Sequence, residues 1–102
     1  MLQSEQIIAA RALLEWSQAD FAEHSGIGLA TIKRIEAKAG TIEVSDTTLA
    51  AIYRAFEFKN VEFINDPGVG VIRHPADADF GIVTDPRAPG GVRRAYARRD
   101  VR

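Results

Sequence analysis

A chain of 102 residues, 46% of them hydrophobic, has the length and apolar content of one small domain with a modest core. The formal net charge is −1, so bulk charge alone does not draw the molecule to polyanions. The absence of cysteine excludes disulfides and thiolate metal sites. No apolar run approaches the roughly 20 residues of a membrane span, and no signal-peptide pattern is present. We therefore expect a cytoplasmic protein with no membrane partner.

The first part of the chain has the apolar spacing of helices. Residues 4–15 carry a stripe at helical periodicity, and we expect Ser4 to cap this helix. Ser17 followed by Asp20 is a capping-box variant that starts a second helix, which we expect to run to about Ser25.

Two further helices follow a tight turn. Gly28, a weaker cap than Ser or Asp, precedes the third helix, which we expect over residues 29–38. Ser45 or Asp46 caps a fourth, amphipathic helix that runs to about Phe58.

A β-hairpin is predicted over residues 60–73. Two short β-like runs, Val61–Ile64 and Val69–Arg73, are separated by Asn-Asp-Pro-Gly, which is a turn signal. Asn60 is expected to end the fourth helix in the left-handed conformation. Because an isolated two-stranded hairpin is marginal in water, it must pack on the helices or pair with a second chain.

The character of the chain changes at residue 74. Proline and glycine interrupt residues 74–102, only Phe80–Val83 is apolar enough for a short strand, and the end is rich in arginine. Residues 1–73 hold 7 basic and 10 acidic groups (−3), whereas 74–102 hold 6 and 4 (+2). We therefore expect one domain over 1–73 and a basic, irregular tail. The tail either grips nucleic-acid phosphate or is a flexible, solubilising end.

The segment that spans the expected second and third helices has the residue spacing of a helix-turn-helix motif. From Gln18, the residues Ala22, Gly26, Ile32 and Ile35 stand at offsets of four, eight, fourteen and seventeen. A small residue is needed where two steeply crossing helices approach, and glycine tolerates the positive φ of the tight turn. Ile32 and Ile35 would form the buried stripe of the helix expected over residues 29–38, which is the second helix of this motif.

These residues carry a resemblance to a known family. The chain resembles helix-turn-helix transcriptional regulators of the phage-repressor/Cro (xenobiotic-response-element) family, in the short bacterial type. In that type a motif similar to NVEFINDPGVGVIR, residues 60–73, follows the fourth helix. The resemblance implies a mostly α fold, in which a four-helix lambda-repressor-like DNA-binding domain over 1–73 ends in a C-terminal β-hairpin, followed by an irregular tail. The residues that carry it are Gln18, Ala22, Gly26, Ile32, Ile35 and Glu36.

The resemblance also implies where DNA binds. In the family the third helix lies in the major groove, and the residue at the position of Gln18 touches phosphate. It further implies a structural pair between Arg11 and Glu36, which we expect to be exposed and of small energetic value. The residues implied to contact DNA are Gly28, Leu29, Ala30, Lys33 and Arg34 at the bases, with Thr31 and Lys38 nearer the backbone.

The chemistry of this outward face is sparse. Arg34 can donate two hydrogen bonds to guanine, whereas Leu29 and Ala30 can make only apolar contact, most usefully with a thymine methyl. Few base-specific donors predict modest specificity or reliance on DNA shape. The alternative is that the cations form an ordinary solvated helix face.

Two functions remain open. The first is a sequence-specific regulator that binds double-stranded DNA as a homodimer, formed through the hairpin or the tail. The second is an antitoxin-like or adaptor module whose partner is a protein, such as a toxin or another regulator. His24 and His74 are isolated, and no catalytic arrangement is recognisable, so we expect no metal, no cofactor and no enzyme.

Overall fold

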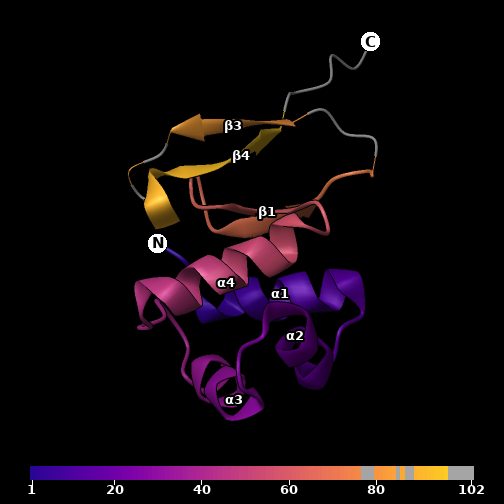
Figure 1. The fold of residues 1–102 in the computed structure, drawn as a ribbon, viewed down its shortest axis with the longest axis vertical. Coiled ribbons are helices and arrows are strands. Elements are labelled where there is room, and N and C mark those ends of the chain that lie inside the picture. The colour runs from indigo at the N-terminus through magenta and orange to yellow at the C-terminus, as the bar shows by residue number, and fades with distance from the viewer. Residues whose placement is uncertain (77–79, 85, 87–88, 97–102) are drawn as a thin grey trace.

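The computed structural model describes residues 1–76, 80–84, 86 and 89–96, in which four helices precede two hairpins (Figure 1). The helices are α1 (Ser4–Leu14), α2 (Gln18–Ser25), α3 (Leu29–Ala37) and α4 (Asp46–Glu57). The strands are β1 (Val61–Ile64), β2 (Gly70–Arg73), β3 (Phe80–Thr84) and β4 (Val92–Tyr96), with a short 3-10 helix, η1 (Pro89–Gly91), before β4. The prediction of four helices followed by a hairpin is confirmed.

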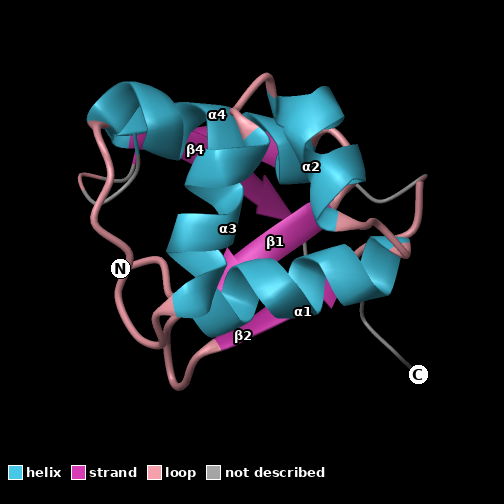
Figure 2. Cartoon of the chain, turned by 90° about the horizontal axis from the view of Figure 1, so that it is seen from below, coloured by secondary structure: helices cyan, strands magenta, loops and turns pink. Residues whose placement is uncertain are grey.

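The elements lie in layers along the longest axis of the molecule. Figure 1 shows the hairpins at one end, α1 and α4 in the middle, and α3 at the opposite end. In the first hairpin, β2 packs along α1 and β1 packs along α4. Figure 2, seen from below, shows α1 and α4 on opposite sides with α3 between them. The hairpins therefore support the helices from the side away from α3.

Aromatic and aliphatic side chains from all four helices meet in one core. Phe21 of α2 and Phe56 of α4 are fully buried, with ring centroids 4.8 Å apart. Trp16, between α1 and α2, packs on Phe56 at 5.4 Å. Contacts of this kind dominate the hydrophobic stabilisation of a small domain.

The start of α1 differs from the prediction that Ser4 caps it. Gln3 is the cap, with extended backbone, and its N–H donates to Oε1 of Gln6 at 2.9 Å. Ser4 is instead the first helical residue and is buried, where its N–H donates to the carbonyl of Gly40 at 2.9 Å. At the other end, Glu15 takes a left-handed φ of 56°, so α1 stops at Leu14.

The other predicted helix starts agree with the structure, and α3 and α4 each end one residue before the predicted position. The Asp20 N–H donates to Oγ of Ser17 at 3.0 Å, and the Ser17 N–H donates to Oδ2 of Asp20 at 2.8 Å, which completes the capping box of α2. Ser45 rather than Asp46 caps α4, accepting a hydrogen bond from the Thr48 N–H at 3.2 Å.

A buried amide fastens the first hairpin to α1. The hairpin is antiparallel, with register from Val61↔Arg73 to Ile64↔Gly70. Nε2 of Gln6 donates to the carbonyls of Ile64 at 2.9 Å and Gly70 at 3.0 Å, at the end of the ladder. Of the two alternatives predicted for this hairpin, packing on the helices is the one that the structure shows, and Asn60 before it has the predicted left-handed φ, 63°.

The tail contains more structure than the one predicted strand. The strand expected over 80–83 runs over Phe80–Thr84 as β3 and pairs antiparallel with β4. The sequence of β4 contains adjacent arginines, which hide its strand character from a search for apolar runs. Parts of the predicted irregular tail, residues 77–79, 85, 87–88 and 97–102, lie outside the described residues.

The capping box of α2 predicts a pH-dependent contribution to stability. The backbone N–H of Ser17 lowers the pKa of the Asp20 carboxyl. A pKa that is lower in the folded state stabilises the fold above the unfolded-state value of about 3.9, and this stabilisation is lost as pH falls through the lowered pKa. We predict that Asp20→Ala lowers the melting temperature at neutral pH and that its effect shrinks in acid. Circular dichroism melts across pH measure this.

The matched control is Glu23→Ala, which removes an exposed carboxylate from the same helix. It should change the melting temperature little at any pH. An effect of Asp20→Ala that is the same at neutral and acid pH would contradict the assignment.

Candidate nucleic-acid interface

The turn between α2 and α3 is fixed by local hydrogen bonds. Gly26 has a left-handed φ of 76°, and its N–H donates to the carbonyl of Ala22 at 2.9 Å. The hydroxyl of Ser25 donates to the carbonyl of Phe21 at 2.7 Å and accepts the Ile27 N–H at 3.1 Å. These bonds satisfy backbone groups at the end of α2, so the direction in which α3 leaves the turn is well defined.

One face of α3 is buried and the opposite face is open. Ile32 is fully buried and Ile35 nearly so, as the helix-turn-helix spacing predicts. We call the exposed surface opposite them the reading face. It is formed by Gly28, Leu29, Ala30, Lys33, Arg34 and Ala37.

The sequence-predicted residues are only partly gathered on this surface. Five of the predicted contact residues lie on the reading face, while Lys38 is exposed at the end of α3 and Thr31 is half-buried at its side. Ala37 is a member that the sequence analysis missed. Its position two turns after Ala30 on the helical repeat was the signal that could have identified it.

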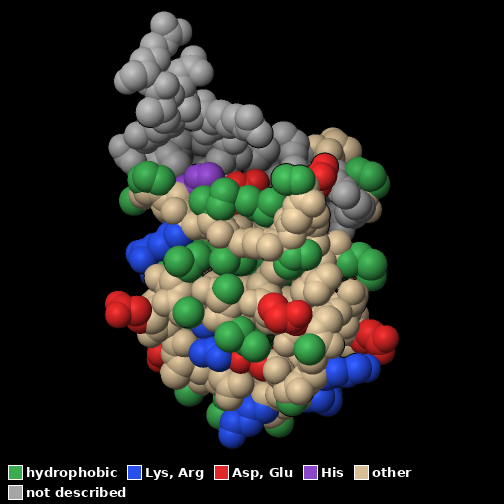
Figure 3. Space-filling model, turned by 180° about the vertical axis from the view of Figure 1, so that it is seen from behind, with side chains coloured by type: hydrophobic (Ala, Val, Ile, Leu, Met, Phe, Trp, Pro, Cys, Tyr) green, Lys and Arg blue, Asp and Glu red, His purple; other side chains and the backbone are tan. Residues whose placement is uncertain are grey.

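The cations of α3 have no salt bridge with any residue in the described part of the chain. Lys33, Arg34 and Lys38 are all exposed, and neither of the salt bridges found there includes them. Figure 3 shows Lys and Arg side chains at the lower end of the molecule, the end at which Figure 1 places α3. The guanidinium and ammonium groups are therefore available to an anionic partner.

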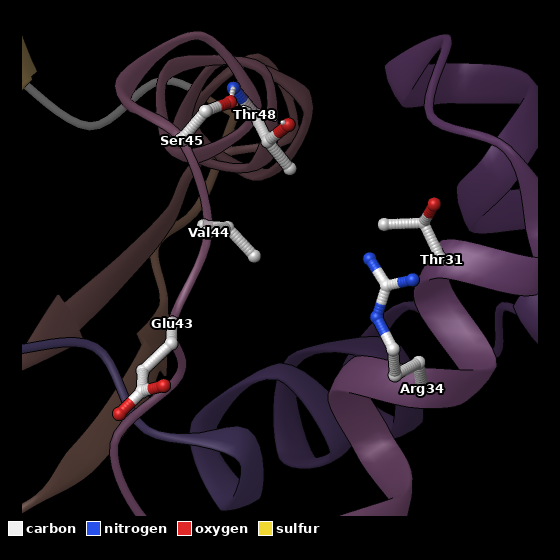
Figure 4. Close-up of a pocket in the computed structure, with 6 residues that line it drawn as sticks. All are labelled: Thr31, Arg34, Glu43, Val44, Ser45 and Thr48. Atoms are coloured by element: carbon white, nitrogen blue, oxygen red, sulfur yellow. Dashed lines mark hydrogen bonds between the residues drawn. The ribbon is translucent and has the colours of Figure 1, made fainter.

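A hollow separates α3 from the start of α4. Figure 4 shows the Arg34 guanidinium extending into this hollow, while the Glu43 carboxylate points away from it. The hollow leaves room for the arginine to change rotamer without breaking a described ion pair. The sequence did not predict that α3 and residues 43–48 lie on two sides of one hollow. The lining residues are Thr31, Arg34, Glu43, Val44, Ser45 and Thr48.

The carboxylate of Glu36 joins three helices behind the reading face. Arg11 of α1 donates from Nε and Nη2 to the two oxygens of Glu36, at 2.7 and 2.6 Å. A third donor, Nη1, reaches the carbonyl of Trp16 at 2.8 Å. The side chains of Arg11 and Glu36 are only 17% and 5% exposed, and their hydrogen bonds raise the pKa of Arg11. The pair itself was expected, but the prediction that it is exposed is wrong.

Gln18 belongs to the same cluster. Its Nε2 donates to Oε1 of Glu36 at 3.2 Å, which links the first residue of α2 to α3. The side chain is half-buried. This bond uses one amide hydrogen of Gln18 and leaves its other amide hydrogen and its amide oxygen for further hydrogen bonds. The predicted contact of Gln18 with DNA phosphate stays a prediction.

The histidines and the possible metal ligands have ordinary surroundings. The ring of His24 stacks on Trp16 with centroids 4.3 Å apart, and Nε2 of His74 lies 2.8 Å from Oε1 of Glu62. Within the described ranges, no cluster of three or more His, Cys, Asp or Glu side chains has the arrangement of a metal site. None of the helices described is long and apolar enough to span a bilayer.

A basic, partly exposed helix that follows a first helix and a tight turn is the arrangement of the DNA-binding helix-turn-helix class. The model of the Helix-turn-helix family matches residues 7–63, more than half of the chain. The chain belongs to this family, in the phage-repressor/Cro-like group, and is a DNA-binding transcription regulator in the general sense. A comparison with curated proteins gives no match.

The Arg11–Glu36 pair predicts a large effect from removing one partner. Arg11→Met leaves the Glu36 carboxylate buried without its guanidinium, and we expect a loss of about 3 kcal/mol in the free energy of unfolding. The double variant Arg11→Met/Glu36→Leu removes both charges and should recover much of this loss. Urea denaturation of the two single variants and the double variant measures the coupling.

The control is Arg54→Met, which removes an exposed arginine from α4. It should change the free energy of unfolding by less than about 0.5 kcal/mol. Losses in Arg11→Met as small as in this control would show that the buried pair contributes little.

Proposed function

We propose that the protein is a sequence-specific transcription regulator that inserts α3 into the major groove of operator DNA as a homodimer. The observation that carries the proposal is the reading face: an exposed helix surface with cations that have no described ionic partner. A major groove about 12 Å wide admits one α-helix.

The local charge of α3 supports DNA over a protein partner. Residues 1–73 carry a net charge of −3, but the only acidic side chain in residues 28–38 is Glu36. Because Arg11 neutralises that carboxylate, the outward surface of α3 and its end present only the charges of Lys33, Arg34 and Lys38. Such a surface attracts the phosphate backbone even though the chain as a whole is nearly neutral.

The residues have distinct proposed roles. Arg34 donates to guanine O6 and N7, and Lys33 contacts a base edge or a phosphate. Gly28, Leu29 and Ala30 lie against base edges. Thr31, Lys38 and Gln18 lie nearer the backbone. Selection of bound duplexes from a random pool tests whether a sequence is preferred. If no pool member binds, the alternative of an antitoxin-like or adaptor module is favoured.

Two copies of α3 on one duplex restrict the dimer geometry. A single module makes few base contacts, so tight binding needs a second copy with its α3 about 34 Å away, on the same side of the duplex. The hairpins lie at the end opposite α3, so contact through their outer ends would turn the two helices away from each other. The proposed two-fold axis therefore lies between the protomers and parallel to their long axes. Perpendicular to its long axis, each protomer measures 29 and 23 Å.

The flank formed by α1 and β2 fits this side-by-side arrangement. Ile8 and Leu13 are exposed large apolar residues of α1 on this flank, whereas Ile72 of β2 lies on the face of the hairpin that points away from the helices. The β2 strand is at the edge of its sheet, and an edge is suited to pairing across a two-fold axis. We propose this flank as the homodimer surface.

The division of the chain is likewise proposed. All buried apolar side chains for which burial is described lie between Leu2 and Val61, which supports a DNA-binding domain over 1–73. Residues 74–102 would then be an appendage to that domain.

Replacing the two cations of the reading face is expected to weaken DNA binding. Lys33→Ala/Arg34→Ala should reduce the affinity for a selected duplex by about tenfold or more, since a bidentate arginine–guanine contact is worth about 1–3 kcal/mol. It should also lower the dependence of the affinity on salt. Lys59→Ala, at the far end of α4, is the matched control. Unchanged gel-shift affinity in the double variant would rule out α3 as the groove-binding element.

A lysine on the proposed dimer flank is expected to produce monomers. Ile8→Lys places two like charges at the interface, whereas Phe58→Lys replaces an exposed apolar residue just after α4. Light scattering at high micromolar concentration should show dimers for the parent chain and Phe58→Lys and monomers for Ile8→Lys. A parent chain that is monomeric at this concentration would overturn the dimer proposal.

A further inference from the structure

We propose that the reading face recognises the C5 methyl group of a pyrimidine next to a guanine, and that either thymine or 5-methylcytosine supplies it. The inference rests on the proposed function, because it requires α3 to lie in the major groove. It adds a substrate feature and a mode of regulation: methylation of cytosine would create a binding site.

The first observation is an exposed leucine at the tip of the reading helix. Leu29 is the first residue of α3 and is 37% exposed, whereas Ile32 and Ile35 supply the buried contacts of the helix. Its neighbours Gly28 and Ala30 are also exposed and offer no side-chain donor or acceptor. The N-terminal part of a recognition helix is the part that contacts base edges. This chain therefore presents apolar groups where polar ones would read hydrogen-bonding patterns.

The second step is the chemistry of the groove floor. Adenine, guanine and cytosine present mainly nitrogen and oxygen atoms in the major groove, and thymine alone of the four bases adds a methyl group, on C5. A leucine pressed onto a polar edge would remove water from it without replacing the hydrogen bond, which is unfavourable. Leu29 therefore favours sites with a methyl at this position. A C5 methyl on cytosine occupies the same place in the groove.

The position of Arg34 indicates which base is adjacent. Ala30 and Arg34 are four residues apart, so they lie one above the other on the reading face. The Arg34 guanidinium has no salt bridge with a described residue and fits guanine O6 and N7. The methyl contacted by Leu29 and Ala30 and the guanine contacted by Arg34 would therefore belong to neighbouring base pairs. The step is thymine–guanine, or 5-methylcytosine–guanine.

The experiment uses the full chain and three random duplex pools. The first pool is ordinary DNA, the second has uracil in place of thymine, and the third has uracil and 5-methylcytosine in place of thymine and cytosine. Selected duplexes are then resynthesised with single thymines replaced by uracil. We expect each contacted methyl to contribute about fourfold in affinity, from the transfer free energy of one buried carbon. The third pool should enrich 5-methylcytosine–guanine where the first enriches thymine–guanine.

The matched variants are Leu29→Ala and Phe58→Ala, which truncate exposed apolar residues at the start of α3 and just after α4. The readout is the ratio of affinities for the thymine and uracil forms of one duplex, which a general loss of affinity does not change. Leu29→Ala should bring the ratio toward one, and Phe58→Ala should preserve it. Equal affinity of the parent chain for both forms, or a ratio unaffected by Leu29→Ala, would overturn the inference while leaving the proposed function standing. If no sequence is enriched in any of the three pools, the proposed function itself is overturned.

Discussion

The ionic cluster around Glu36 is the constraint on which the direction of α3 depends. Two donors of Arg11 and one of Gln18 converge on this carboxylate, so a single group at the inner side of α3 is bonded to both α1 and α2. Apolar contacts alone would bury α3 but would allow it to slide or rotate, because they are not directional. Hydrogen bonds to one carboxylate require a particular rotation of the helix. The cluster thus gives the reading face its direction.

The same cluster explains how a nearly neutral chain presents a basic surface. A glutamate in α3 would weaken the field of its neighbouring cations if it pointed into solvent. The Glu36 side chain is paired with Arg11 and is only 5% exposed, so its charge is cancelled locally. The cations on the other side of the helix then have no salt bridge with a described residue. Net charge is consequently a poor guide to what this fold binds, and the distribution of charge over α3 is the relevant quantity.

Most of the features that the sequence predicted correctly are set by neighbours in the chain, although the cap of α1 at Ser4 was a local prediction that failed. Helical periodicity, the Ser17–Asp20 capping box and the positive φ of Gly26 depend on residues a few positions apart, and all three appear in the structure. The burial of the Arg11–Glu36 pair was mispredicted because exposure depends on segments 25 positions apart in the chain. The hollow beside Arg34 was missed for the same reason, and so was the role of Gln6, which looks in the sequence like an ordinary helical glutamine.

Helix α1 is the common support of α3 and the first hairpin. Near its start, the amide of Gln6 holds both strands of the first hairpin, and near its end, the guanidinium of Arg11 holds α3. The hairpin bonded by Gln6 and the helix α3 bonded by Arg11 lie at opposite ends of the molecule. If two protomers meet along α1 and β2, the distance between their two α3 helices is then set by one rigid element in each protomer. In such a proposed dimer, a change in the position of α1 would alter the distance between the two α3 helices without a change in any residue of α3.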